Sequence, residues 1–195
     1  MSETPSSAGR GRKPRPPGDS GLPRRIEEML RVDHAGEYGA VAIYRGQLAV
    51  FGRQSGRERI TAQLTEMAEQ EQAHLDAFDK LLASGRVRPT ALSPVWNAAG
   101  FALGAATALL GEKAAHACTE AVETVIEEHY GDQVAELEAE GDTELASKLA
   151  KFRDEEIAHK NLAAAEGASE APGYPVLSAL IRTGCRLAIR ISEKV

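Results

Sequence analysis

Cysteine, aromatic residues and positive charge are all scarce in this 195-residue chain. The two cysteines, Cys118 and Cys185, form no CxxC pair, so the sequence offers neither a disulfide framework nor a thiolate zinc site. This cysteine usage fits a reducing compartment. Aromatic residues make up only 5% of the chain, while alanine, leucine and glutamate are abundant, and this composition favours helix over strand.

The net charge of −6 at pH 7 argues against a nucleic-acid binder, which would carry a basic stripe across its folded part. We therefore expect no nucleic-acid partner. Hydrophobic residues at 43% and charged residues at 27% are typical of a globular protein. The length suits one well-buried core, so we expect a single folded domain.

Residues 1–22 lack any apolar run and are rich in serine, glycine, proline and arginine. Such a segment buries too little apolar surface to order itself, and it contains no hydrophobic region of a secretory signal. We expect a disordered basic tail over 1–22, followed by one folded region over 23–195. Contact between the basic residues of the tail and anionic lipid stays open as an alternative.

From Arg24 onward, apolar residues recur at spacings of three and four, which predicts helices almost throughout. Glycine-containing stretches such as "GRQSG" and "SGRVRP" separate them, and Asp142 is a candidate N-cap. The expected helices cover residues 24–51, about 57–84, 110–138, 142–166 and 175–193.

Two short motifs repeat: "EQAH" at 71–74 and "EIAH" at 156–159. Positions i and i+3 of a helix share a face, so each motif directs one carboxylate and one imidazole the same way. Random placement of Glu and His already gives about 0.6 such pairs, so the motif alone is weak evidence. The surrounding pattern has to decide its meaning.

Equal distance from a turn supplies that pattern, because residues equally far from the turn of an antiparallel hairpin lie at the same height. Glu37 and Glu71 are equidistant from the "GRQSG" turn, and Glu123 and Glu156 are equidistant from "EAEGD". The separations are 34 and 33 residues, so the two-helix unit is an internal repeat. The sequence thus predicts one convergent set: Glu37, Glu71, His74, Glu123, Glu156 and His159.

Four carboxylates and two imidazoles from four helices form the ligand set of a dinuclear metal centre in a four-helix bundle. Four carboxylates balance the charge of two divalent ions, and the mixed nitrogen and oxygen donors suit iron or manganese. Without metal, the same carboxylates would repel one another in a buried position. The competing interpretation places the glutamates on solvated helix faces and treats the two histidines as incidental.

Some neighbouring residues leave the assignment ambiguous. His34 and Glu120 pass the same height test, but they are chemically unlike each other, whereas Glu37 and Glu123 repeat. We expect His34, His116 and His129 to be hydrogen-bonded around the site or to lie at the surface. Two acidic residues beside the second motif either orient a ligand imidazole from outside or are simply solvated, namely Asp154 and Glu155.

Two segments have the character of membrane-associating elements. Residues 89–111 contain no charged residue, and we expect them to form the long crossover between the hairpins, at a membrane interface, buried, or spanning a bilayer, in that order of preference. Residues 175–193 place Arg182, Arg186 and Arg190 on one flank of a helix and apolar residues on the other. Such a helix suits either an anionic lipid surface or packing on the bundle.

The stretches "RVDHAGEYGAVAIYRGQLAVFGR" (31–53), "RVRPTALSPVWNAAGFALGAATALLG" (86–111), "CTEAVETVIEEHYGDQ" (118–133) and "FRDEEIAH" (152–159) resemble the demethoxyubiquinone hydroxylases, the di-iron monooxygenases of ubiquinone biosynthesis. The resemblance covers residues 24–195. It implies an all-α, ferritin-like four-helix bundle of two helical hairpins, with a long apolar crossover and an additional C-terminal amphipathic helix. It also implies two iron ions per chain, held by Glu37, Glu71, His74, Glu123, Glu156 and His159.

The implied reaction is hydroxylation of a polyprenylated methoxy-benzoquinol, demethoxyubiquinol, with O₂. His129 and Tyr130 resemble the family's candidates for relaying protons or electrons, and Gly36 and Gly39 leave room for a ring beside Glu37. The expected partners are the polyprenyl quinol substrate, a membrane surface, a lipid-presenting protein of ubiquinone biosynthesis and further copies of the chain in a homo-oligomer. The expected location is peripheral, on the cytoplasmic face of a bacterial inner membrane or the matrix face of the mitochondrial inner membrane.

Two rival functions remain at this point. A ferritin-like iron-oxidising or storage protein would use the same ligands, but it should lack apolar membrane segments. A non-catalytic membrane-associated scaffold bundle would bind no iron. Iron quantitation and product analysis separate these three functions.

Overall fold

The computed structural model describes residues 20–194, and within that range it contains α-helices, one 3₁₀ turn and no strand. The expected tail over 1–22 falls mostly on residues 1–19, which lie outside the described part. The helices are α1 (Arg24–Phe51), α2 (Glu58–Gly85), α3 (Ser93–Leu109), α4 (Glu112–Glu140), α5 (Thr143–Ala165) and α6 (Tyr174–Ser192).

The helix ends follow from local sequence signals. Asp142 is the N-cap of α5, and its carboxylate accepts a hydrogen bond from the Leu145 amide at 3.2 Å, as predicted. Gly141 ends α4 in the left-handed conformation with φ of 83°, which glycine adopts without a Cβ clash. The five helices predicted from the sequence begin and end within two residues of the observed bounds.

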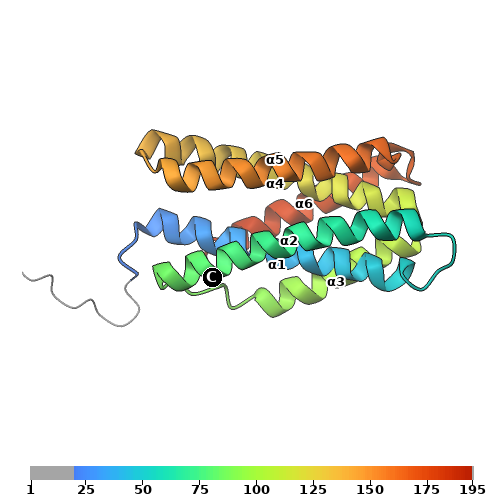
Figure 1. Cartoon of the computed structure of the whole chain (residues 1–195), viewed down its shortest axis with the longest axis horizontal. Helices are drawn as coiled ribbons and strands as arrows, with labels where there is room; N and C mark the ends of the chain where they lie inside the picture. Colours follow the sequence, from blue (N-terminus) through green and yellow to red (C-terminus); the bar gives the residue numbers. More distant parts are fainter. Residues whose placement is uncertain (1–19, 195) are drawn as a thin grey trace, which may run out of the picture.

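Two antiparallel hairpins, α1–α2 and α4–α5, form a four-helix bundle, which confirms the predicted all-α, ferritin-like architecture (Figure 1). The third helix belongs to the crossover, runs along α1 and joins the end of α2 to the start of α4. The last helix, α6, packs mainly on α4. The repeat seen in the sequence is therefore a repeat of helical hairpins.

The crossover helix approaches the backbone of α1 very closely. A Cβ at Gly100 would lie 2.6 Å from the Gly39 carbonyl oxygen, and one at Gly104 would overlap the Ile43 carbonyl. On α1, a Cβ at Gly46 would overlap the carbonyl of Phe101. Glycine is required at these three positions because any side chain would force the two helices apart.

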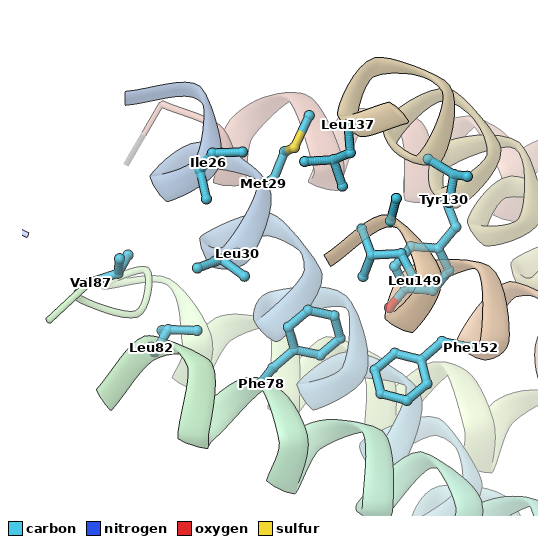
Figure 2. Packing of buried hydrophobic residues seen from close by; sticks show 12 residues of the cluster. Ile26, Met29, Leu30, Phe78, Leu82, Val87, Tyr130, Leu137, Leu149 and Phe152 are labelled. Atoms are coloured by element: carbon cyan, nitrogen blue, oxygen red, sulfur yellow. The ribbon is translucent and has the colours of Figure 1, made fainter. Parts of the chain in front are cut away.

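Two apolar clusters fill the bundle above and below the level of the repeated glutamates. One contains Met29, Phe78, Leu137, Leu149 and Phe152, with side chains from α1, α2, α4 and α5 pointing toward one another (Figure 2). The other lies toward the α1–α2 turn and includes Tyr44, Phe51, Leu64 and Met67. The polar layer between them is sealed from solvent on both sides.

The uncharged segment 89–111 contains a 17-residue helix, α3, and several of its apolar side chains face outward. Leu109 is 75% exposed, and Val95, Phe101 and Leu110 are also exposed. Among the helices over residues 20–194, none combines the length and apolarity needed to cross a bilayer.

Candidate metal centre

Each of the four bundle helices contributes to one buried polar layer. The helices α1 and α4 each bring one glutamate, and α2 and α5 each bring a Glu-x-x-His pair one helical turn long. All six side chains belong to residues that are at most 3% exposed: Glu37, Glu71, His74, Glu123, Glu156 and His159.

The six residues form two overlapping groups, within each of which the candidate ligand atoms lie within 4.8 Å of one another. Glu71 and Glu156 belong to both groups. Glu37 and His74 complete the first group, while Glu123 and His159 complete the second. The arrangement offers two adjacent cation positions that share two carboxylates.

Both imidazoles turn their Nδ1 atoms toward the shared carboxylates. His74 Nδ1 lies 3.0 Å from Glu156 Oε1 and 3.6 Å from Glu37 Oε2. His159 Nδ1 lies 3.2 Å from Glu71 Oε1 and 3.2 Å from Glu156 Oε2. A cation in either position would be bound through Nδ1, which leaves Nε2 free to donate a hydrogen bond outward.

The outward nitrogens are held across the bundle by the opposite hairpin. His74 Nε2 lies 2.6 Å from Glu155 Oε2, and His159 Nε2 lies 2.6 Å from Gln70 Oε1. Glu155 therefore has the outer orienting position that the sequence left open, whereas Asp154 is exposed and pairs with Arg153. Such outer contacts fix the tautomer and the orientation of a ligand imidazole.

A tyrosine hydroxyl reaches each of the two unshared glutamates, again from the opposite hairpin. Tyr44 of α1 donates to Glu123 Oε1 at 2.9 Å, and Tyr130 of α4 donates to Glu37. Burial, followed by the charge of nearby glutamates, raises the pKa of both tyrosines well above the usual value, so both hydroxyls keep their protons.

Sequence reasoning singled out Tyr130 but missed Tyr44 and Gln70. The repeat contains a signal for both. Tyr44 follows Glu37 by seven residues, as Tyr130 follows Glu123, and Gln70 precedes its motif as Glu155 precedes the other.

The pKa shifts in the layer indicate that added positive charge would stabilise its carboxylates. Burial first, and then the neighbouring carboxylates, raise the pKa of Glu71 and Glu123 well above the usual range. Burial alone would raise the pKa of Glu156, but His159 and His74 lower it to about 2. Burial would lower the pKa of His74, yet close contacts with Glu156 and Glu37 raise it to about 11.

Two observations show that the residues fit a dinuclear metal ion site: the pKa shifts of the buried groups and the unpaired polar atoms of the layer. Four buried atoms of the layer have no hydrogen bond of suitable geometry, although buried polar atoms are almost always paired. They belong to residues of the two groups, and they are Glu37 Oε2, Glu71 Oε1, His74 Nδ1 and Glu156 Oε1.

The other candidates lie outside the two groups. His34 Nε2 lies 3.0 Å from Asp79 Oδ1, and Glu120 accepts a hydrogen bond from the Tyr174 hydroxyl. His129 Nε2 lies 3.1 Å from the buried Asp33 carboxylate. His116 is buried and belongs to neither group. The roles of His129 and Tyr130 in catalysis stay predictions.

An apolar groove of about 530 Å³ adjoins the centre between α1, α3, α4 and α6. Gly36 and Gly39, which flank Glu37, line it together with Trp96, Ile126 and Ile181. A Cβ at Gly39 would meet no atom within 4 Å, so the glycine leaves space open in the groove. The groove therefore offers an apolar molecule a route to the α1–α4 side of the layer.

Comparison with known proteins agrees with this geometry. Residues 24–192 match the family described as ubiquinone biosynthesis protein COQ7. A 3-demethoxyubiquinol 3-hydroxylase of Rhodospirillum rubrum is 53% identical over 181 residues, which cover 92% of this chain and 82% of that protein.

Eukaryotic relatives are similar over nearly the same length. The Homo sapiens protein named NADPH-dependent 3-demethoxyubiquinone 3-hydroxylase, mitochondrial, is 47% identical over 173 residues, covering 87% of this chain and 78% of that one. The Saccharomyces cerevisiae 5-demethoxyubiquinone hydroxylase, mitochondrial, is 38% identical over 184 residues, with the same coverage of each chain.

Proposed function

The chain belongs to the family of the ubiquinone biosynthesis protein COQ7, and from this we propose that it is a 3-demethoxyubiquinol 3-hydroxylase. It acts in ubiquinone biosynthesis and inserts one atom of O₂ into the ring of demethoxyubiquinol. Two electrons from a reductant and two protons convert the other oxygen atom to water.

One observation carries the proposal: two overlapping, buried Glu and His groups lie beside an apolar groove whose lining includes Gly36 and Gly39, the α1 neighbours of Glu37. We propose that they would hold two iron ions per chain, with Glu71 and Glu156 available to both positions. When bound, the iron pair supplies the activation of O₂, which no side chain of the layer can perform. The protein orients the ring beside the centre and keeps water out.

The groove suits a quinol with a long apolar tail. The glycines Gly36 and Gly39 leave open space in the groove, and we propose that a planar ring lies there against α1. The tail follows the apolar walls toward the gap between α3 and α6, past Leu180. Burial of this apolar surface anchors the ring without any charged contact.

Tyr130 and Tyr44 hold protons at the edge of the centre, on hydroxyls bonded to Glu37 and Glu123. The His129 ring lies 6.3 Å from the Tyr130 ring, between centroids, and is bonded to Asp33. We propose that protons pass between the partly exposed His129 edge and Glu37 by way of Tyr130, with a water molecule bridging His129 and the Tyr130 hydroxyl.

We propose that the exposed apolar side chains around the groove mouth rest on a membrane surface. On α6, Val176, Leu180 and Leu187 are all more than half exposed, as is Leu109 at the end of α3. Arg190 is exposed on the same helix, in a position to contact anionic lipid headgroups. A substrate dissolved in the bilayer would then enter the groove directly.

The face of the membrane on which the chain acts is a proposal as well: the cytoplasmic face in a bacterium, and the matrix face in mitochondria, the organelle for which two of the relatives are named. A lipid-presenting partner and a homo-oligomer stay predictions.

The test is turnover by the reconstituted protein. Metal-free protein is loaded with Fe²⁺ without oxygen, and then receives a short-chain demethoxyubiquinol analogue, O₂ and NADPH, chosen because the human relative is named NADPH-dependent. We expect about two iron ions per chain and a product heavier by one oxygen atom. Glu71→Gln should abolish the product, and Glu69→Gln, two residues away and exposed, should not.

Each alternative outcome has a distinct meaning. Two bound irons without hydroxylated product would favour an iron-oxidising protein. Absence of bound iron would favour a scaffold. For the membrane proposal, flotation with anionic phospholipid vesicles should be lost in Leu109→Lys combined with Leu180→Lys, and retained in Glu69→Lys.

A further inference from the structure

The two imidazoles of the centre receive different partners on their outward nitrogens. His74 Nε2 faces the carboxylate of Glu155, and His159 Nε2 faces the amide oxygen of Gln70, both at 2.6 Å. We propose that this pair makes the two metal positions unequal, so that the position beside His74 binds a divalent ion more tightly and fills first. The inference rests on the proposed metal centre.

The direct donors to the two positions are matched. Each contains the shared Glu71 and Glu156, one unshared glutamate and one imidazole bound through Nδ1. Each unshared glutamate receives one tyrosine hydroxyl, from Tyr130 or Tyr44. Among the groups that contact the two imidazoles by hydrogen bonds, the charge of the outer acceptor is therefore what distinguishes the two positions.

A carboxylate acceptor has a definite effect on the imidazole. A hydrogen bond to a charged acceptor is stronger than one to a neutral amide, and it shifts electron density from the ring N–H toward Nδ1. The His74 imidazole is therefore the stronger donor to a cation. The His159 imidazole is oriented equally well by Gln70 but receives no charge from it.

The effect should be moderate because solvent reaches the acceptors. The Glu155 side chain is 35% exposed, and Lys151 Nζ lies 3.5 Å from its other oxygen. Gln70 is also exposed. Loss of such outer partners costs about 10- to 100-fold in metal affinity, and the partial exposure of Glu155 favours the lower end, about tenfold.

The chain provides matched controls for each substitution. Asp154, next to Glu155, is 69% exposed at its side chain and bonds only to Arg153 among the described contacts. Asp154→Asn removes the same charge as Glu155→Gln without touching an imidazole partner. Gln72→Glu adds the same charge as Gln70→Glu, two residues away, on a side chain bonded to Asp76.

The experiment titrates the full-length, metal-free protein with Co²⁺ and follows the visible absorption of the bound ion and the heat of binding. Wild type should bind two ions in two resolved steps. In Glu155→Gln the first step should weaken about tenfold and merge with the second. Gln70→Glu should strengthen the second step, and the double exchange should restore two steps, filled in the reverse order.

A spectroscopic readout assigns the order. With one equivalent of ⁵⁷Fe²⁺, wild type should give one dominant Mössbauer doublet, Glu155→Gln a mixture of two, and the double exchange the other doublet. The controls Asp154→Asn and Gln72→Glu should match wild type in both experiments.

Two results would overturn the inference, and they are distinguishable. If wild type binds two ions and hydroxylates the quinol, but Glu155→Gln binds metal as Asp154→Asn does, the two positions are not set apart by Glu155. If wild type binds no Co²⁺ or Fe²⁺ at all, the metal centre itself is refuted, and this inference fails with it.

Discussion

The hairpins α1–α2 and α4–α5 repeat each other on their inner faces and differ on their outer faces. Inside, each supplies a glutamate, a tyrosine two turns later and a Glu-x-x-His motif. Outside, α1 is covered by α3 through glycine contacts, whereas α4 is covered by α6 through side chains. The inner and outer faces therefore have separate roles. The repeated inner residues form the candidate metal centre, and the unlike outer faces give an apolar molecule access from one side.

The largest effect is expected from breaking the shared part of the repeat. Glu71→Gln removes a carboxylate that belongs to both groups, so the rate of hydroxylation should fall by more than about a hundredfold. This loss is larger than the loss expected when a residue that only orients a ligand is removed. Turnover with the short-chain quinol analogue measures this, and Glu69→Gln is the matched control.

The same variant should be more stable than wild type when metal is absent. Burial and the neighbouring glutamates raise the pKa of Glu71, so its ionised form costs stability above about pH 4.5, where it is ionised in the unfolded chain. The advantage of Glu71→Gln in urea unfolding should therefore be absent below that pH and grow as the pH rises. Equal stability of the two proteins at pH 7 would contradict this electrostatic account.

The outer faces predict opposite results for two glycine substitutions. Gly104→Ala places a methyl group against the Ile43 carbonyl and should destabilise the protein by about 1–3 kcal/mol. Gly131→Ala on α4 meets no atom within 4 Å and should stabilise it by up to about 1 kcal/mol. Urea unfolding measures both, and a neutral Gly104→Ala would mean that α3 is free to move away from α1.

Sequence periodicity was sufficient for the repeated parts of the molecule. Regular apolar spacing gave the helices, and distance from the turns gave the height of the six candidate ligands, because both depend on local helix geometry alone. The contact of α3 with α1 could not be predicted in this way, since glycines such as Gly46 and Gly104 acquire their role only from the partner backbone. Tyr44 and Gln70 could have been predicted, because they occupy the positions of the repeat that correspond to Tyr130 and Glu155.

Replacing Tyr44 or Tyr130 tests whether the two repeated tyrosines have the same role in function. Phenylalanine at either Tyr44 or Tyr130 leaves one buried carboxylate without its hydroxyl donor, which should cost about 1–3 kcal/mol in unfolding free energy. Equal losses of turnover would mean that both tyrosines only hold a carboxylate. A clearly larger loss in Tyr130→Phe would identify the proton route through His129, which Tyr44 lacks.

The smallest expected effect concerns His129, which has no counterpart in the first hairpin. The equivalent position, six residues after Glu37, is Ile43, and the equivalent of Asp33 is Thr119. Burial lowers the pKa of His129, but the hydrogen bond and charge of Asp33 outweigh it and raise the pKa overall. The protonated imidazole therefore stabilises the fold.

A raised histidine pKa fixes the sign of the pH dependence. The stabilisation is complete below about pH 6.5, where the histidine is also protonated in the unfolded chain, and it is lost as the pH rises through the raised pKa of the folded protein. In urea unfolding of the metal-free proteins, the free energy of unfolding of wild type should be higher than that of His129→Gln by about 1 kcal/mol at pH 5.5. The difference should be smaller at pH 9. Glutamine can still donate a hydrogen bond to Asp33. A stability difference between the two proteins that does not change with pH would therefore assign the effect to packing. The charge of His129 would then have no part in distinguishing the second hairpin from the first.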